Sequence, residues 1–316
     1  MTQKKIIAVA GATGAQGGGV VRAILKDKDG QFAARALTRD PNSDKARKLA
    51  DLGAEVVKAD LHDPDSLKKA FEGAYGAYCV TFFWNHFSPE TEFMEASNLA
   101  NAARDAGLKH VVWSTLEDTR QYVPLDDTRM PTLMGKYKVP HFDAKGEADA
   151  VFRDSGVPTT YLLASSYWEN FIYGRSGPKK DQNGEIVLSL PMADAKLCGI
   201  ASEDIGKCAY GMFRRGPELA GKRIGLAGEQ LTGVEMAQKF SRAFGKPVRY
   251  NAVPFDVFRG LGFPGAEDVG NMFQFYTEFA DMVGKTRDVA ASRELNPELQ
   301  SFDEWLDLNK DKLPLE

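Results

Sequence analysis

Three glycines near the start of the chain, Gly11, Gly14 and Gly17, have a spacing that suits the binding of a diphosphate. An apolar run at residues 6–10 precedes them and an amphipathic run at residues 20–25 follows them, as in a strand, turn and helix that bind a dinucleotide. The backbone N–H groups in the first turn of such a helix face the anion, and the helix dipole adds to the attraction. A glycine-rich turn without a ligand is the alternative. The predicted loop consists of Gly11, Ala12, Thr13, Gly14, Ala15, Gln16 and Gly17.

The end of the second predicted strand indicates which dinucleotide the loop would bind. A carboxylate about 20 residues after the glycines accepts the ribose hydroxyls of NAD(H), whereas this chain has Arg39 in that region. A guanidinium group pairs with a 2′-phosphate through charge-assisted hydrogen bonds, so we expect NADP(H), with Thr38 and Ser43 as further donors. A surface ion pair between Arg39 and Asp40 is the alternative.

His141 and Lys145 are the candidate catalytic residues. They are four positions apart, which places both on one face of a helix. An imidazole next to an ammonium group tends to stay neutral and is then a weaker acid than imidazolium. We therefore expect Lys145 to anchor the cofactor ribose, and His141 to be either a general acid or a structural residue. Ser114 or Thr115, at the end of the fifth predicted strand, is a candidate hydroxyl for orienting a carbonyl group.

The remaining polar residues suggest an adenine contact but no metal. Asp60 and Leu61 follow the third predicted strand and are expected near the adenine, although Asp60 could equally be a turn residue. The four histidines are neither close together in the sequence nor near a cysteine, so we predict no metal site. The three cysteines have no metal-like spacing, which favours buried thiols in a reducing compartment.

Apolar runs alternate with amphipathic runs through the first half of the chain. This alternation predicts an α/β fold, a Rossmann-type doubly wound parallel sheet whose ligand lies at the carboxyl ends of the strands. We expect the NADP-binding domain over residues 1–165 and a smaller mixed α/β domain over residues 166–316, with some later segments returning to the first domain. The expected strands are residues 6–10, 32–38, 54–59, 77–81, 110–114 and 159–164.

The pattern changes after the fifth strand. Residues 117–140 lose their periodicity and contain three prolines, so we expect a loop that is either a binding lid or disordered. Residues 255–279 are rich in aromatic side chains, which form either the core of the smaller domain or a pocket. Thr232 with Glu235, and Ser301 with Glu304, have the spacing of capping boxes and predict two helix starts.

The charge balance excludes some classes of partner. The chain has 40 basic and 44 acidic residues and a formal net charge of −4, so it lacks the positive field that attracts nucleic acid. No apolar run approaches the roughly 20 residues of a membrane span, and the first apolar residues belong to the predicted first strand rather than to a signal peptide. We expect a cytoplasmic protein that contacts no membrane.

Several motifs of the chain resemble the NmrA-like family, an atypical branch of the short-chain dehydrogenase/reductase group. They are residues 11–18, 38–39, 53–57, 141–147, 167–170 and 261–266. The resemblance implies that the glycine loop binds the diphosphate and Arg39 the 2′-phosphate, and that Lys145 binds the nicotinamide ribose. It further places Thr81, Phe82 and Phe83 near the ribose, and Tyr167, Trp168, Glu169 and Asn170 beside the nicotinamide.

The family resemblance also implies two functions. Some members bind NADP(H) and regulate partner proteins, and others reduce quinones or related small molecules. The chain lacks a tyrosine four residues before Lys145, where reductases of the parent group have one. We therefore expect a redox sensor that regulates a partner protein, either as a monomer or as a homodimer. The alternative is an NADPH-dependent reductase of quinones, enones or similar small-molecule carbonyl substrates.

Overall fold

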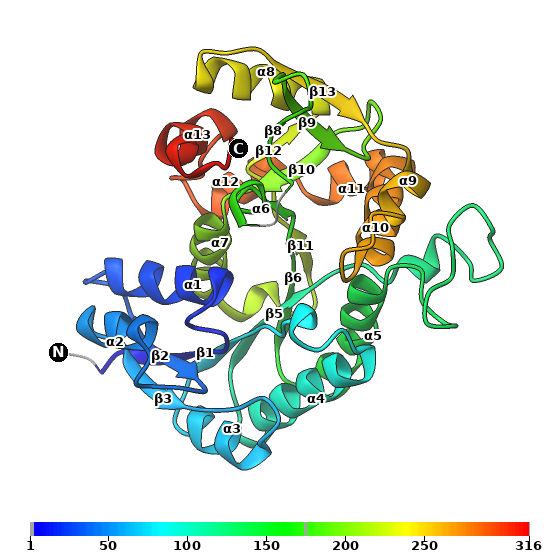
Figure 1. The fold of residues 1–316 in the computed structure, drawn as a ribbon. Helices are drawn as coiled ribbons and strands as arrows, with labels where there is room; N and C mark the ends of the chain where they lie inside the picture. Colours follow the sequence, from blue (N-terminus) through cyan, green and yellow to red (C-terminus); the bar gives the residue numbers. More distant parts are fainter. Residues whose placement is uncertain (1–2, 174–175, 316) are drawn as a thin grey trace. The chain divides into compact units, whose positions relative to one another are not determined.

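The computed structural model describes residues 3–173 and 176–315, and its largest sheet contains seven strands. These strands are β1 (Lys5–Val9), β2 (Phe32–Thr38), β3 (Glu55–Lys58), β4 (Gly76–Cys79), β5 (His110–Thr115), β6 (Thr159–Leu163) and β11 (Arg223–Gly225). Their order is β11-β6-β5-β4-β1-β2-β3 (Figure 1), and β1 to β6 pair in parallel. This is the predicted Rossmann-type sheet, and the order reverses between β1 and β4, where such sheets bind their ligands.

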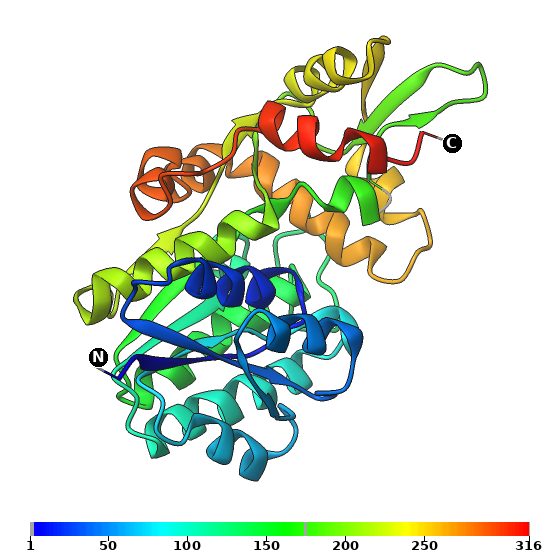
Figure 2. The ribbon, with the colours of Figure 1, turned by 90° about the vertical axis from the view of Figure 1, so that its left-hand side faces the viewer.

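Helices connect the strands and cover both faces of the sheet. They are α1 (Ala15–Lys26), α2 (Asp44–Asp51), α3 (Pro64–Phe71), α4 (Pro89–Asp105), α5 (Pro140–Asp154) and α7 (Ser202–Arg215). Figure 1 and Figure 2 show α1 and α7 on one face of the sheet, with α3 and α4 on the other. Such coverage explains why every residue of the central strands β4 and β5 is buried.

The face covered by α3, α4 and α5 is packed by apolar side chains. Leu67 and Phe71 of α3 and Leu99 of α4 are fully buried, as are Trp113 of β5 and Phe152 of α5. The rings of Trp113 and Phe152 stack with centroids 4.5 Å apart, a contact that contributes about 1 kcal/mol beyond its buried area. This core fixes the carboxyl ends of β4 and β5, where polar residues begin.

On the opposite face, α1 and α7 touch through their backbones. A Cβ atom added to Gly206 of α7 would lie 2.2 Å from the carbonyl carbon of Gly19, and one added to Gly19 would lie 3.1 Å from the carbonyl oxygen of Glu203. The guanidinium group of Arg22 also hydrogen-bonds the Glu203 carboxylate, with Nε 3.0 Å from Oε1. The position of α1 therefore depends on small residues in both helices.

The chain divides into two compact units, each described by itself. Unit 1 consists of residues 3–118, 144–164 and 202–224, and unit 2 consists of residues 119–143, 165–173, 176–201 and 225–315. Unit 1 contains most of the large sheet together with the short helix η3 (Gly216–Leu219). No helix within the described ranges is long and apolar enough to cross a membrane.

Unit 2 contains two sheets of three strands, with the orders β12-β10-β7 and β13-β9-β8. The predicted capping boxes at Thr232 and Ser301 are confirmed, since each side chain accepts the N–H of the glutamate three residues later. The elements are β7 (Ser166–Tyr167), α6 (Asn170–Tyr173), β8 (Lys179–Lys180), β9 (Ile186–Leu190), β10 (Leu197–Ile200), β12 (Glu229–Leu231), α8 (Gly233–Phe244), β13 (Val248–Ala252), α9 (Phe255–Arg259), α10 (Ala266–Glu278), α11 (Ala280–Thr286), α12 (Val289–Leu295) and α13 (Phe302–Asn309).

The segment predicted as a lid or a disordered loop is packed within unit 2. The buried Lys138 donates from Nζ to the carbonyl oxygens of Asp127 and Met130, each at 2.7 Å. Asn271 of α10 donates to the carbonyl oxygens of Pro131 and Lys138 at 2.9 and 2.6 Å. Burial lowers the pKa of Lys138. These bonds give residues 119–140 a defined conformation against α10.

Within the aromatic run at residues 255–279, the residues of α10 pack in the core of unit 2. Phe273, Phe275 and Tyr276 of α10 are buried, whereas Phe263, between α9 and α10, is exposed. The ring centroids of Phe275 and Tyr276 lie 6.4 Å apart. Of the two interpretations of this run, a core role therefore fits the residues of α10.

A substitution at Gly206 tests the backbone contact between α1 and α7. Gly206→Ala should lower the free energy of unfolding by about 2 kcal/mol, because a Cβ 2.2 Å from backbone atoms forces the helices apart. Gly260→Ala is the control, since its Cβ would meet its nearest atoms at 3.5 Å and its φ is −77°. Urea unfolding of both variants measures the difference, and equal stability would contradict the packing described.

Candidate functional site

The turn between β1 and α1 has the geometry of an anion-binding loop. Gly11 has a φ of +61°, in the left-handed region that favours glycine. The N–H of Gly14 donates to the carbonyl oxygen of Gly11 at 2.8 Å. A Cβ on Gly17 would lie 2.4 Å from the same oxygen, so only a glycine allows α1 to begin this close to the loop. Gly11 and Gly17 therefore have a steric reason to be glycine, whereas a Cβ on Gly14 would lie 3.2 Å from the Gly11 carbonyl oxygen.

The first turn of α1 is open to a ligand. Within the described residues, no side chain caps Gly14, and the first turn of the helix contains no acidic residue. Gly11, Gly14 and Ala15 are exposed, while Ala12 is buried and Thr13 half-buried. The N–H groups at this end and the positive end of the helix dipole are consequently available to a phosphate.

Gln16 turns away from the loop into a buried polar group. Its Oε1 accepts hydrogen bonds from the hydroxyls of Tyr78 and Ser114, the latter at 2.8 Å. Ser114 is 2% exposed. The Ser114 hydroxyl is thus buried and bonded to the side chain of Gln16.

Arg39 lies exposed after the end of β2. Its guanidinium group has no hydrogen bond or ion pair with any residue the structure describes. The alternative pair with Asp40 is not formed among the described residues, and Oδ1 of Asp40 accepts the N–H of Asn42 at 2.9 Å. Ser43 caps α2 and donates its hydroxyl to the carbonyl oxygen of Asp40 at 2.9 Å. The loop therefore has a fixed shape that presents an unpaired cation.

Two other predicted adenosine contacts have local roles. The Thr38 hydroxyl lies 3.4 Å from the carbonyl oxygen of Asp40, to which it donates. Oδ1 of Asp60 accepts the N–H of His62 at 3.0 Å, so Asp60 shapes a turn, and Leu61 is half-buried. These bonds are compatible with a ligand beside them, because a carboxylate or hydroxyl oxygen accepts more than one hydrogen bond.

Lys145 is bound to the segment that follows β4. Its Nζ donates to Oγ1 and to the carbonyl oxygen of Thr81 at 2.6 and 3.2 Å, and lies 2.6 Å from Oε1 of Glu92. The Thr81 hydroxyl donates to the same Oε1. All three N–H bonds of the ammonium group therefore have an acceptor nearby. Phe82, next to Thr81, is 58% exposed, whereas Phe83 is buried.

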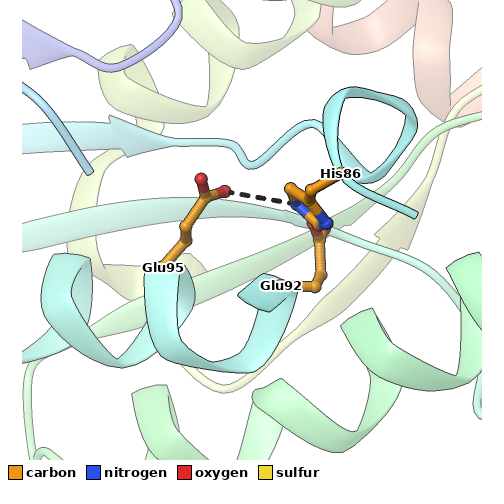
Figure 3. A group of neighbouring side chains, drawn as sticks. All are labelled: His86, Glu92 and Glu95. Carbon is orange, nitrogen blue, oxygen red and sulfur yellow. Dashed lines mark ion pairs between the residues drawn. The ribbon is translucent and has the colours of Figure 1, made fainter. Parts of the chain in front are cut away.

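Glu92 and two neighbouring residues form a group of three potential metal ligands. Figure 3 shows Glu92 and Glu95 of α4 with the ring of His86, which follows the short helix η1 (Phe83–Asn85). Nε2 of His86 lies 3.4 Å from Oε2 of Glu92 and 3.9 Å from Oε2 of Glu95. Sequence reasoning missed this group because it sought histidine and cysteine pairs; the spacing of two glutamates by three residues on one helix was the available signal.

Glu95 links this group to the exposed His62. Its Oε1 lies 2.8 Å from Nε2 of His62. Burial raises the pKa of Glu95, and the nearby charge of Glu92 adds to the rise, while the hydrogen bond from His62 opposes it. Glu95 thus carries a cost when it is ionised in the folded protein.

In unit 2, His141 is bound to Asp268. Its Nδ1 lies 2.6 Å from Oδ1 of Asp268, and its backbone N–H donates to Oδ2 at 3.1 Å. The histidine is 7% exposed. Since Asp268 belongs to α10, the pair joins the start of α5 to that helix.

The predicted nicotinamide segment also lies in unit 2. Tyr167 pairs with Ile200 in a sheet, and Trp168 is buried with its ring 5.2 Å from that of Phe302. Oε1 of Glu169 accepts the indole N–H of Trp305 at 3.1 Å, and Asn170 begins α6. The segment is held by aromatic packing to the C-terminal helix α13.

The sequence matches that of a protein family over most of the chain. Residues 3–306 match the model of the NmrA-like family. The chain belongs to the NmrA-like family. The NmrA-like family domain-containing oxidoreductase FrzB of Cladobotryum sp is 32% identical over 296 residues, which cover 85% of this chain and 83% of that protein. An NmrA-like family domain-containing protein of Dictyostelium discoideum is 26% identical over 314 residues, covering 96% of this chain and 97% of that one.

Solved structures share the fold. NmrA, a negative transcriptional regulator, was solved in complex with NADP; it has a TM-score of 0.78 and 24% identity, over 96% of this chain and 95% of that chain. The triphenylmethane reductase of Citrobacter sp., complexed with NADP(H), has a TM-score of 0.74 and 21% identity, over 96% and 99% of the two chains. These likenesses establish the fold of this NmrA-like protein.

The raised pKa of Glu95 leads to a prediction for the stability of this NmrA-like protein. A carboxyl group whose pKa is higher in the folded state favours folding at low pH, and this contribution is lost as the pH rises through the folded-state value. Glu95→Gln mimics the protonated acid, so its melting temperature should exceed that of the wild type at about pH 8 and equal it at about pH 4. Asp307→Asn, an exposed carboxylate of α13, is the control. A pH-independent difference for Glu95→Gln would contradict the prediction.

Proposed function

We propose that this protein binds NADP(H), with the diphosphate at the first turn of α1 and the 2′-phosphate on Arg39. The unpaired, exposed guanidinium group of Arg39 is the observation that carries the proposal. A guanidinium without a carboxylate partner loses no ion pair when it binds a phosphate, and each charge-assisted hydrogen bond contributes about 1.5 to 3 kcal/mol. The same fold binds NADP in NmrA and in triphenylmethane reductase, which supports the proposal.

A charge reversal at Arg39 tests the choice of cofactor. Arg39→Glu should weaken NADPH binding by about 100-fold, because it removes the partner of the 2′-phosphate and adds a repelling charge, whereas NADH binding should change by less than about threefold. Fluorescence titration with both cofactors measures this. Arg47→Glu is the control, because it makes the same charge change at an exposed position of α2. It should alter the affinity for neither cofactor by more than about threefold. Equal weakening of NADPH and NADH in Arg39→Glu would refute the assignment.

We infer that the bound cofactor serves a regulatory role, as a redox sensor for a partner protein. The N–H bonds of Lys145 are taken by Thr81 and Glu92, and Nδ1 of His141 is bound to Asp268. The ammonium group of Lys145 is thus occupied by protein acceptors, which favours an anchoring role over proton donation to a substrate. A sensor must bind NADPH and NADP⁺ with different affinity or in different conformations, because a ligand shifts an equilibrium only through differential binding.

The names of the curated relatives favour a second function, an NADPH-dependent reductase. FrzB, at 32% identity, is an oxidoreductase by name. In such a reaction the nicotinamide C4 would deliver a hydride to a quinone, an enone or a similar carbonyl compound, and water would supply the proton. Positioning of the two reactants would account for most of the rate.

Two measurements distinguish the regulator from the reductase. For a regulator, NADPH consumption with a panel of quinones and enones stays at the background rate, and hydrogen exchange over residues 119–140 differs between the NADPH and NADP⁺ complexes. For a reductase, NADPH is consumed in proportion to enzyme concentration. Turnover combined with identical exchange in both complexes would contradict the regulatory role.

A further inference from the structure

Glu92 lies at the centre of a buried polar group at the carboxyl end of β4. It has no exposed surface, and its Oε1 contacts both Lys145 and the hydroxyl of Thr81. A buried carboxylate is costly unless it is paired and hydrogen-bonded. In the described part of the chain, Lys145 and Glu92 face each other, and His86 is the next titratable group beside Glu92. Glu95 lies on the far side of the His86 ring, and His62 contacts Glu95.

A backbone hydrogen bond determines the tautomer of a neutral His86 beside Glu92. The N–H of Ser88 donates to Nδ1 of His86 at 3.0 Å, so the neutral ring carries its proton on Nε2. Nε2 lies 3.4 Å from Oε2 of Glu92 and 3.9 Å from Oε2 of Glu95, the latter pair being marked in Figure 3, and in the described structure neither Nε2 nor Oε2 of Glu92 has a hydrogen-bond partner. A metal ion at this place would need the lone pair of Nε2, with the proton on Nδ1, which is the opposite tautomer. Lys145 already balances the charge of Glu92.

We propose that Glu92 is a positioning residue for Lys145. Together with Thr81 it sets where the ammonium group lies at the end of β4, so that Lys145 meets the ribose of a bound cofactor from a fixed place. The other oxygen of the carboxylate lies 3.4 Å from Nε2 of His86 without a hydrogen bond in the described structure, so Lys145 and Thr81 are the bonded partners of Glu92. The inference rests on the proposed function, in which Lys145 anchors the nicotinamide ribose.

Glu92→Gln and Glu95→Gln form a matched pair of variants. Both change a buried glutamate of α4 that faces His86, but of the two only Glu92 contacts Lys145 in the described structure. Glu92→Gln should raise the Kd for NADPH about tenfold, and binding should fail at a lower alkaline pH than in the wild type, because a buried ammonium group without a counter-charge gives up its proton more readily. Glu95→Gln should leave the Kd within about twofold.

Two further variants separate the effect of the charge at residues 92 and 145 from the effect of side-chain length. Lys145→Arg in the Glu92→Gln background should remove the added pH dependence, since a guanidinium group keeps its charge. Glu92→Asp retains the charge on a shorter side chain, so it should weaken binding without moving the pH at which binding fails. It also provides the test if Glu92→Gln does not fold.

The outcomes that overturn the inference are distinct from failure of the proposed function. If the wild type does not bind NADPH, the proposed function is wrong. If the wild type binds NADPH, and Glu92→Gln and Glu92→Asp match it in Kd and pH dependence, only the positioning role is wrong. A third outcome also overturns the inference by showing a cation site. In this outcome, Zn²⁺ raises the affinity of the wild type for NADPH, and both Glu92→Gln and Glu95→Gln abolish this effect of Zn²⁺ equally.

Discussion

The close approach of α1 to the turn after β1 is the constraint on which the rest of the structure depends. Carbonyl oxygens of the turn lie where a Cβ of Gly17 would be, so the helix begins almost in contact with the strand end. This places the first turn of α1 at the carboxyl edge of the sheet, beside the ends of β2 and β4. The helix can hold that position because its other side packs against α7 through Gly19 and Gly206.

Two cations of unit 1 stand at this edge in contrasting environments. Arg39 is exposed and has no partner among the described residues, whereas Lys145 is largely buried and bound to Thr81 and Glu92. An unpaired cation gains a full set of hydrogen bonds from an incoming phosphate, while a saturated one can only exchange partners. The exposed, unpaired guanidinium group of Arg39 therefore suits selection of a phosphorylated ligand. The bonded ammonium group of Lys145 suits a fixed contact to a neutral hydroxyl, such as that of a ribose.

Local patterns in the sequence were sufficient to predict six of the seven strands of the sheet, and β11 at its edge was missed. The six expected strands all appear in it, because alternation of apolar strands with amphipathic helices restricts the topology. The capping boxes were equally readable, since they depend on residues three positions apart. What could not be predicted depends on contacts between distant segments. The hydrogen bond from Ser114 to Gln16 joins residues 98 positions apart, and the meeting of His86 with Glu92 and Glu95 depends on how the chain turns after β4.

Calorimetry with fragments of the cofactor tests the central claim most directly. Adenosine 2′,5′-bisphosphate carries the 2′-phosphate and one phosphate of the diphosphate, whereas 5′-AMP lacks the group assigned to Arg39. The account predicts that the bisphosphate binds the wild type at least about tenfold more tightly than 5′-AMP and competes with NADPH. Equal affinity for the two fragments, or no detectable heat with either, would contradict it.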